Sequence, residues 1–486
     1  MLGEHDFIAG AAHCAHLLMQ HAEASRGVSR CPGEVHLASM PPIAEGGVAS
    51  VERSGQMRIM CLDGPGDAIG SFEHWERGED IGNVTHVPFS RQLFDVCHEL
   101  DAKLWLIGEH PRIDRVERGN FIIEHRGRAS RGKAGGAYHL SELNHARKIM
   151  ADVLRFRADL VIMSPRPSPL LMSMLRAVRV RFVMVLYCVL WRKFAPPRGV
   201  RRALSRFNAP MYRWGAEAVL CISEEVKRQV RELAGPSSGP FVDFLPQFRE
   251  EVFAGIAKPQ AAVRPFRVMF AGRIERNKGV FDLVEVAKRL RQRGRDDIVF
   301  DICGDGGAFE QLKAHVRQFQ LEEMFALHGW CDRSQMRACF SRSHVVVVPT
   351  TTDFIEGFNM VVVEALLAGR PVISSPVCPA LEYLDGAVVT VPPDDIAAYE
   401  AAIVGLADDA ERYNELQHRS ERAGRRFLDE RTSLKAALEH TLGAIARGER
   451  VVAKEIAGLD AVNGRVQAQA EDVRGEVLHS EPLARG

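Results

Sequence analysis

The feature that most constrains the fold is a repeated alternation of short apolar runs with helical or loop segments. Parallel strands that are buried on both faces form continuous apolar runs, and the runs in this chain have that form. Their alternation with helical segments predicts an α/β protein with mostly parallel sheets. The runs are residues 58–62, 103–107, 160–163, 182–190 and 218–222 in the first half, and 266–270, 298–303, 344–349, 371–374 and 388–391 in the second half.

The length of 486 residues predicts two or three domains. A cluster of Pro, Gly and Ser at residues 235–240 and a polar stretch at 258–264 lie between the two series of strands, which is typical of a junction. Segments without apolar periodicity at both ends are expected to be poorly ordered. The expected divisions are an extension at residues 1–55, a first domain at 56–255, a second domain at 266–425, a helix at 426–447 and a tail at 448–486.

The composition narrows the choice of partner and compartment. Lys plus Arg and Asp plus Glu both number 63, so the formal net charge is zero and gives no overall attraction to nucleic acid. The ten cysteines include no CxxC pair and no metal-like spacing with His, which favours buried free thiols in a reducing compartment. No segment approaches the roughly 20 apolar residues of a membrane span, and the N-terminus lacks a secretory signal. We therefore expect a cytoplasmic protein.

Two cations lie in a glycine-flanked loop between a predicted strand and a predicted helix. Gly272 allows a sharp turn after the strand, and Gly279 helps to open the helix. Arg273 and Lys278 project from this loop, where they could neutralise a diphosphate. Ligands of open α/β sheets bind at the carboxyl ends of strands, which is where this loop lies. For this motif on its own, a solvated basic loop is the alternative.

Two glutamates, eight positions apart, flank the start of a predicted helix at residues 360–368. Glu356 lies in the preceding loop, and Glu364 lies about one turn inside the helix. A helix start offers unpaired N–H groups to phosphate, and a carboxylate can accept hydrogen bonds from vicinal hydroxyls such as those of a ribose. Either acid alone could be a solvated surface group. Both acids, in register with the Gly-Phe-Asn turn at residues 357–359, favour a binding site.

The order and spacing of these motifs resemble the donor domain of the GT-B glycosyltransferases, in particular family 4. The similarity extends over residues 266–390 and also includes the Gly-Asp-Gly turn at 304–306 and the Gly-Arg-Pro-Val-Ile run at 369–373. It implies an α/β protein of GT-B fold, in which two Rossmann-like domains face each other across a cleft and a C-terminal helix crosses back to the first domain. It further implies a retaining glycosyltransferase of the hexosyltransferase type (EC 2.4) without a bound metal.

The resemblance also assigns roles to the residues that match the family's motifs. Arg273 and Lys278 would hold the donor diphosphate and Glu356 would lie by the donor sugar, so these three are the implied catalytic residues. The cations would stabilise the leaving diphosphate, where charge develops in the transition state. Metal independence is consistent with the absence of an Asp-x-Asp motif from the sequence. The implied donor-binding residues are Gly272, Gly304, His328, Gly329, Gly357, Phe358, Asn359 and Glu364, with Glu364 on the ribose and with Gly304, His328 and Gly329 around the base or sugar.

The first half of the chain matches the family less well. Residues 82–98 look like the first loop and helix of an acceptor domain, but the Gly-Gly pair of many relatives is absent. Many relatives also carry a His near the end of a middle strand, whereas residues 187–191 contain none. His86 and His110 lie in predicted loops, where an ordinary surface role is favoured. No catalytic His is therefore assigned.

A basic and aromatic segment runs from Arg176 to Phe207. Basic residues interleaved with aromatic ones suit an anionic membrane surface, which would place the protein at the inner membrane face and make a lipid-linked acceptor plausible. A solvated face near the cleft is the alternative. Single-stranded nucleic acid would also suit this composition, but nothing else in the sequence favours it.

The sequence thus predicts a glycosyltransferase that uses a nucleotide-diphosphate sugar, UDP- or GDP-linked, and a carbohydrate or lipid-linked acceptor in polysaccharide or glycolipid assembly. No cofactor besides this donor is expected. Two alternatives stay open, namely a catalytically inactive sugar-nucleotide-binding partner and a nucleotide-sugar epimerase of the same architecture. A nicotinamide enzyme is disfavoured, because the glycines at residues 64–70 do not have the dinucleotide-binding spacing.

Overall fold

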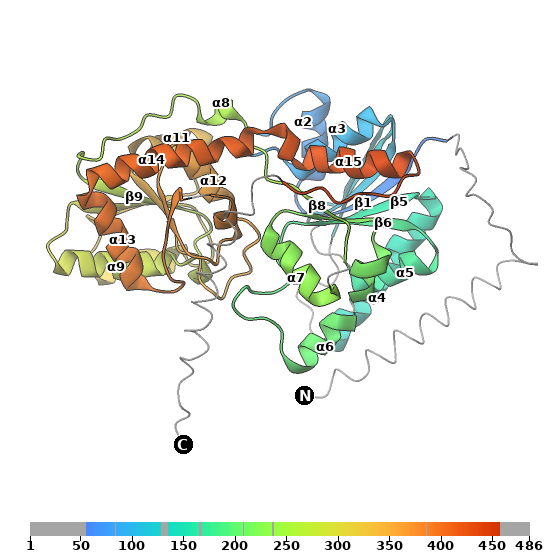
Figure 1. Cartoon of the computed structure of the whole chain (residues 1–486), viewed down its shortest axis with the longest axis horizontal. Helices are drawn as coiled ribbons and strands as arrows, with labels where there is room; N and C mark the ends of the chain where they lie inside the picture. The colour runs from blue at the N-terminus through green and yellow to red at the C-terminus, as the bar shows by residue number, and fades with distance from the viewer. Residues whose placement is uncertain are drawn as a thin grey trace, which may run out of the picture.

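The computed structural model describes residues 55–82, 84–127, 135–164, 168–207, 209–235, 238–384 and 386–456. These residues form two α/β domains, each built on a central sheet with helices packed against it (Figure 1). The extension predicted at 1–55 lies almost wholly outside the described residues, as does most of the tail predicted at 448–486. No helix in the described part of the chain combines the length and the apolar character that crossing a membrane requires.

The first domain is organised around an eight-stranded sheet that is parallel except for one edge hairpin. In this hairpin, β3 (Asp114–Arg118) pairs with β4 (Phe121–Arg126) in the antiparallel direction. The sequence pattern does not predict it, because β3 is polar and largely exposed and therefore contains no apolar run. The sheet order is β3-β4-β2-β1-β5-β6-β7-β8, with β1 at Arg58–Pro65, β2 at Lys103–Glu109, β5 at Leu160–Met163, β6 at Arg181–Leu186, β7 at Ala218–Cys221 and β8 at Phe241–Asp243.

The helices of the first domain begin where the sequence offers caps. α7 (Glu224–Ala234) follows Ser223, whose hydroxyl accepts a hydrogen bond from the Val226 N–H, and it has two glutamates in its first turn. α5 (Pro169–Ala177) is capped by Ser168 and has proline at its first position. The remaining helices are α2 (Ala68–Glu76), α3 (Phe89–Glu99), α4 (Gly135–Phe156), α6 (Gly199–Phe207), a π-helical turn at Met211–Gly215 and α8 (Glu250–Phe253).

The second domain contains a six-stranded, fully parallel sheet in the order β11-β10-β9-β12-β13-β14. Numbered along this domain, the order is 3-2-1-4-5-6, which is that of the Rossmann fold. The strand order reverses between β9 and β12, so ligands are expected at the carboxyl ends of these two strands. The strands are β9 (Phe266–Ala271), β10 (Ile298–Cys303), β11 (Phe325–Gly329), β12 (Val345–Val348), β13 (Val372–Ser374) and β14 (Val388–Thr390).

All of these strands except β11 coincide with predicted apolar runs. β11 is an edge strand whose side chains are mostly half-buried or exposed, so its sequence lacks a continuous apolar run. The helices of this domain are a 3₁₀ turn at Arg276–Lys278, α9 (Val280–Gln292), α10 (Phe309–Gln318), α11 (Arg333–Arg342), α12 (Met360–Leu367), a 3₁₀ turn at Pro379–Tyr383, α13 (Ile396–Asp408) and α14 (Ala410–Gly424).

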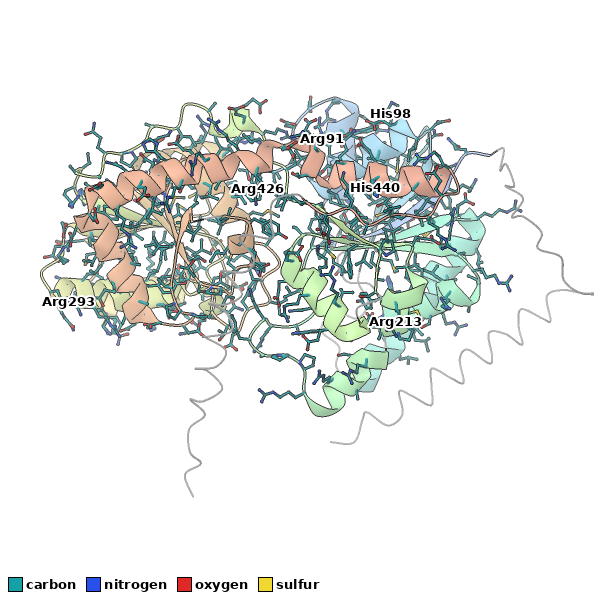
Figure 2. All side chains as sticks on the ribbon, viewed as in Figure 1. Arg91, His98, Arg213, Arg293, Arg426 and His440 are labelled. Atoms are coloured by element: carbon teal, nitrogen blue, oxygen red, sulfur yellow. The ribbon has the colours of Figure 1, made fainter. Side chains whose placement is uncertain are left out.

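After α14 the chain returns to the first domain through α15 (Leu434–Ala446), as Figure 1 shows. Arg426, in the connecting segment labelled in Figure 2, donates a hydrogen bond to the carbonyl of Tyr383 at 2.7 Å. The Lys435 N–H, at the start of α15, donates to Gln92 Oε1 on α3 at 2.8 Å. The predicted fold, including the C-terminal helix that crosses back, is confirmed.

Candidate active site

The loops after β9, β10 and β11 meet at the carboxyl edge of the second sheet. Gly304 has a φ of 143°, and a Cβ on it would lie 1.9 Å from the carbonyl oxygen of Gly272. Only glycine allows this approach. The Gly304 N–H donates in turn to the carbonyl of Gly329 at 2.7 Å. The structure therefore brings together the three glycines that were predicted to line the donor pocket.

The two predicted cations converge on one aromatic ring in the loop after β12. Lys278 Nζ lies 3.6 Å from the ring centroid of Phe354, and the Arg273 guanidinium lies 5.7 Å from the same centroid. Arg273 is exposed and donates to Glu275 Oε1 at 2.8 Å. Cations over an aromatic face are attracted by its quadrupole, so Phe354 holds both side chains on the same side of the loop. Sequence reasoning did not single out Phe354.

Glu356 is the centre of a buried polar cluster in this loop. Its Oε2 accepts hydrogen bonds from Lys278 Nζ at 2.9 Å, from Asn359 Nδ2 at 3.0 Å and from Thr350 Oγ1 at 3.5 Å. Glu356 is only 8% exposed, and a carboxylate at that depth needs such a cationic partner. The predicted diphosphate ligand Lys278 and the predicted sugar ligand Glu356 are thus direct neighbours.

Asn359 begins α12 in a strained conformation. Its φ is +80°, and its side chain makes no capping hydrogen bond, so the first N–H groups of the helix have no side-chain cap. Its Oδ1 is buried and has no hydrogen-bond partner among the described residues. Strained, unpartnered polar groups at a helix start are suited to a ligand that supplies both donors and a negative charge.

The two residues before Asn359 serve packing as well. The Phe358 side chain is buried and packs on Tyr383 and Phe427, with ring centroids 5.5 Å and 5.9 Å away. Only its backbone can therefore contact a donor, and a backbone contact is what the resemblance implies for residues 357–359. A Cβ on Gly357 would lie 2.0 Å from the carbonyl oxygen of Tyr187, so glycine is required where the two domains touch.

Glu364 contacts the first domain rather than the Lys278 cluster. Its Oε1 accepts a hydrogen bond from Thr85 Oγ1 at 2.5 Å, across the domain boundary. Burial raises the pKa of the Glu364 carboxyl to about 7, while the bond from Thr85 opposes this rise. Sequence reasoning missed Thr85, because the contact joins residues from different domains.

The imidazole of His328 points toward α11. Its Nε2 lies 2.7 Å from Asp301 Oδ1 and 2.8 Å from Arg342 Nη2. The side chain is therefore engaged within the second domain, and it is the backbone of this strand end that remains beside the glycine cluster. The expectation that His328 and Gly329 line the base or sugar pocket therefore stays a prediction, carried by the backbone of this strand end.

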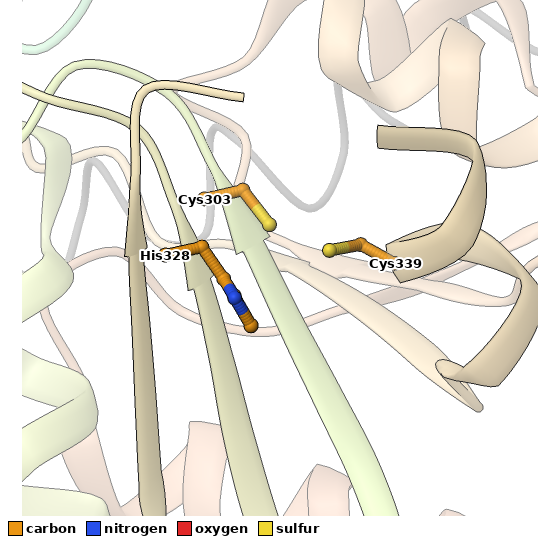
Figure 3. A group of neighbouring side chains, drawn as sticks. All are labelled: Cys303, His328 and Cys339. Carbon is orange, nitrogen blue, oxygen red and sulfur yellow. The ribbon is translucent and has the colours of Figure 1, made fainter. Parts of the chain in front are cut away.

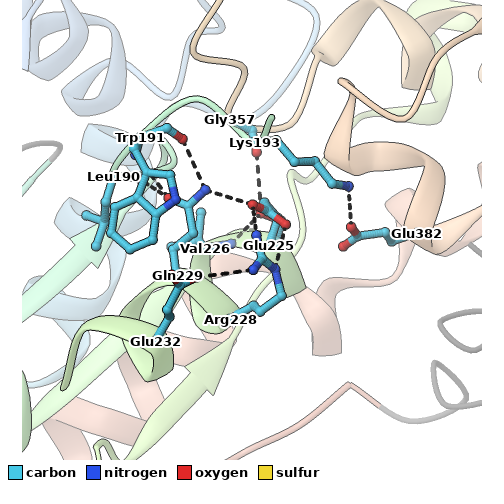
Figure 4. Close-up of polar contacts among 11 residues, drawn as sticks. Leu190, Trp191, Lys193, Glu225, Val226, Arg228, Gln229, Glu232, Gly357 and Glu382 are labelled. Atoms are coloured by element: carbon cyan, nitrogen blue, oxygen red, sulfur yellow. Dashed lines mark hydrogen bonds and ion pairs between the residues drawn. The ribbon is translucent and has the colours of Figure 1, made fainter. Parts of the chain in front are cut away.

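Two cations of the predicted membrane segment form ion pairs with the second domain. Lys193 is buried and forms an ion pair with Glu382 at 3.0 Å (Figure 4). Arg192 forms an ion pair with Asp353 at 2.8 Å. The preceding backbone is fixed by Gln229, whose Oε1 accepts from the N–H groups of residues 190 and 191 (Figure 4). This part of the basic segment is an interdomain contact.

A cavity of about 640 Å³ opens beside this contact. The residues that line this cavity do not include Arg273, Lys278 or Glu364. It is lined by Arg192 from the first domain and by Glu275, Arg276, Asn277, Asp282, Thr351, Asp353 and Asp394 from the second.

Three side chains of the first domain are candidates for a role in the active site, namely a carboxyl, an imidazole and a phenol. Desolvation by burial shifts the pKa of each. Asp63, at the switch point between β1 and β5, is desolvated, and this raises its pKa to about 6. Desolvation also lowers the pKa of His86 to about 4, so this imidazole is neutral at physiological pH. Tyr187 lies directly after β6, and its burial raises the pKa of its hydroxyl. Sequence reasoning missed Asp63, since a single acid after a strand is a common pattern.

Two Rossmann-like domains joined by a returning C-terminal helix define the GT-B class of fold. Sucrose-phosphate synthase from Thermosynechococcus elongatus has a similar structure, with a TM-score of 0.59 at 15% identity over 81% of this chain and 99% of that chain. HepE from Anabaena, solved in complex with UDP, gives a TM-score of 0.52 at 13% identity over 86% of this chain and 100% of that chain. At these identities the similarity shows the fold alone.

The family model described as Glycosyl transferases group 1 matches residues 255–426, so the second domain is a Glycosyl transferases group 1 domain. Glycogen synthase from Mycobacterium tuberculosis is 26% identical over 218 residues, which are 43% of this chain and 51% of that protein. The chain therefore spans about half the length of this curated relative.

Proposed function

We propose that this protein is a glycosyltransferase that moves a sugar from a nucleoside diphosphate donor to an acceptor, with retention of configuration and without a catalytic metal. The observation that carries this proposal is the cluster of Lys278, Glu356 and Asn359 at the uncapped start of α12. It lies after β12, at the switch point where a Rossmann sheet binds ligands. The group 1 domain at residues 255–426 supports the same activity.

The diphosphate of the donor would lie between the cations and the helix start. Lys278 and Arg273 approach from the loop after β9, and the free N–H groups of α12 approach from the loop after β12. As the sugar leaves, negative charge develops on the diphosphate, and preorganised cations and N–H dipoles stabilise it. A divalent ion is not needed for this task, which fits the proposed metal independence.

The sugar and ribose would be held by the two acids. Glu356 and the unpartnered Oδ1 of Asn359 can accept hydrogen bonds from sugar hydroxyls. Glu364 can accept from the ribose hydroxyls once Thr85 releases it. A UDP- or GDP-linked sugar is the proposed donor, and the complex of HepE with UDP supports a uridine nucleotide.

The acceptor is proposed to be a carbohydrate or a lipid-linked carbohydrate, in polysaccharide or glycolipid assembly. The polar cavity beside Arg192 has walls from both domains, as an acceptor passage between them requires. Arg179 and Arg198 are exposed, so part of the basic segment can reach anionic headgroups of a membrane.

A catalytically inactive nucleotide-sugar-binding partner is a second candidate. One observation favours it, since residues 187–191 contain no His, which the resemblance to the family would place there. A nucleotide-sugar epimerase would use the same donor pocket, but no residue of the structure favours it over transfer.

Donor turnover by the purified full-length chain distinguishes these functions. A panel of UDP- and GDP-sugars is first screened by thermal shift, because a ligand of the native state raises the melting temperature. Slow release of UDP or GDP from the stabilising donor, lost in Glu356→Gln and kept in the control Glu285→Gln, is expected of a transferase. Binding without release, across a full panel of acceptors, would contradict it. Isomerised donor would favour the epimerase.

A further inference from the structure

Three metal-ligating side chains lie together at one edge of the second domain (Figure 3). Cys303 ends β10, His328 lies on β11, and Cys339 lies on α11. Their ligand atoms are all within 4.8 Å of one another. Both thiols are almost fully buried, at 2% and 3% exposure, while the imidazole is partly exposed.

The topology explains why these residues meet although the sequence spacing gave no metal signal. β10 and β11 pair in parallel, with Ile302 opposite Leu327, so the next residues of both strands reach the same end of the sheet. α11 follows β11 and packs over this edge, with Cys339 and Arg342 one turn apart and both directed at the cluster. The ligands thus come from two strands and a helix instead of a short sequence motif.

Cys331 supplies a third thiol and the fourth candidate ligand. Cys331, between β11 and α11, lies near Cys303, but its Sγ is not within 4.8 Å of all three of the other ligand atoms and instead lies 3.4 Å from the carbonyl oxygen of Gly329, so it would have to turn toward the ion. The cluster therefore offers three sulfur ligands and one nitrogen. This composition is that of structural zinc sites, in which ligand atoms lie about 3.5–3.8 Å apart around the ion.

We propose that Cys303, His328, Cys331 and Cys339 form a structural site for a thiophilic divalent metal, of which zinc is the best fit. Small side-chain rotations bring ligand atoms from the observed separations to those of a tetrahedral ion, and the partly exposed His328 gives the ion a path of entry. The site is independent of the proposed transfer reaction, which uses no metal.

The groups around the cluster match what such a site needs. His328 Nε2 lies 2.7 Å from Asp301 Oδ1, which is the carboxylate contact that commonly orients a metal-bound imidazole through its other nitrogen. Arg342 donates to Cys339 Sγ at 3.1 Å, which favours a thiolate there. The Asp301 carboxylate is itself paired with Arg267. Three thiolates and a divalent ion leave one net negative charge, which Arg342 offsets.

The position of this site gives it a structural role. Cys303 immediately precedes Gly304, and His328 immediately precedes Gly329, and these two glycines are hydrogen-bonded to each other. An ion bound here would fix the ends of β10 and β11 and therefore the loops that follow them. Because β11 is an edge strand with few buried side chains, it gains most from such a cross-link.

Cobalt titration of the full-length protein tests this site. The reduced protein is stripped with a chelator and titrated with Co²⁺, whose thiolate complexes absorb in the near ultraviolet. We expect one equivalent to bind with this absorption, Zn²⁺ to displace it, and bound Zn²⁺ to raise the melting temperature. Cys303→Ala and Cys339→Ala should lose the absorption, whereas Cys221→Ala, a buried thiol in the first domain, should keep it.

A further variant tests metal binding at a position where substitution should not prevent folding. His328→Gln changes a partly exposed side chain, so it should fold, as circular dichroism will show, yet bind Co²⁺ at least tenfold more weakly. Unchanged metal binding in Cys303→Ala, Cys339→Ala and His328→Gln would overturn the proposal. So would a wild-type protein that binds neither ion but forms a disulfide between Cys303 and Cys339 on mild oxidation, since the cluster would then be a thiol pair.

Discussion

Thr85 of the first domain donates a hydrogen bond to Glu364 of the second domain, with 2.5 Å between Oγ1 and Oε1. This contact occupies the carboxylate that the proposed function assigns to the ribose of the donor. Donor binding and this interdomain contact should therefore compete for the same oxygen.

The competition is tested by Thr85→Val, which removes the hydroxyl and keeps the shape. At about pH 8.5, where Glu364 is ionised in both proteins, we expect UDP to bind about fivefold more tightly to the variant, because the net value of one hydrogen bond is about 1 kcal/mol. Titration calorimetry measures this. Weaker binding by Thr85→Val would show that Thr85 supports the ligand instead of competing with it.

Donor affinity should depend on pH through the same carboxyl. Burial raises the pKa of Glu364 to about 7, and only the carboxylate can accept two ribose hydroxyls. UDP should therefore bind more tightly as the pH rises from about 6 to about 8, and then level off. In Glu364→Gln this dependence should disappear. A wild-type affinity that is flat across the interval would remove Glu364 from the site.

The raised pKa of Glu364 also makes the stability of the folded protein depend on pH. The folded pKa lies above the ordinary value of 4.5, so the stability that Glu364 contributes is fully present below about pH 4.5 and is lost as the pH rises through about 7. Relative to the wild type, Glu364→Gln should therefore gain stability between these values. Urea unfolding at both ends of the interval provides the comparison.

Lys278 should matter for both stability and turnover. Lys278→Met leaves the buried Glu356 without its cation, which costs about 3 kcal/mol of unfolding free energy, and it should lower turnover by about 10²-fold or more. Adding Glu356→Gln should recover much of the stability and none of the activity. The matched control is Lys288→Met, whose ion pair with Glu285 lies on the surface of α9. Recovered activity in the double variant would contradict the catalytic assignment.

Gly357 should be intolerant of any side chain. In Gly357→Ala the new Cβ would meet the carbonyl of Tyr187 at 2.0 Å, so the two domains could not approach as they do here. We expect donor turnover to fall about 10²-fold with little change in the melting temperature of the second domain. Gly307→Ala, where the Cβ would meet no atom within 4 Å, serves as the control. Equal activity of the two variants would show that this domain arrangement is not the reactive one.

Sequence patterns predicted the strands that carry the site because parallel strands buried on both faces are mostly apolar. β9, β10 and β12 are such strands, and their loops hold Arg273 and Glu356. β11 and the β3–β4 hairpin lie at sheet edges, where half-exposed side chains remove the signal. Local sequence patterns therefore identify buried strands and miss edge strands whose side chains are partly exposed.

Contacts between distant segments could not be predicted in this way. Nothing near Glu364 in the sequence indicates Thr85, and nothing near Cys303 indicates Cys339, because topology alone brings them together. The roles of Lys278 and Glu356 were implied by the resemblance to the family, and the structure places their side chains in contact. The contact of His328 with Asp301 could not be predicted either, because Asp301 lies on the neighbouring strand β10.

The most direct test of the central claim is a crystal structure of the full-length protein with UDP. The account predicts the β-phosphate within hydrogen-bond distance of Lys278 Nζ and of the first N–H groups of α12, with the ribose hydroxyls on Glu364 in place of Thr85. A nucleotide bound elsewhere, with Lys278 still paired to Glu356 and Thr85 still on Glu364, would contradict it.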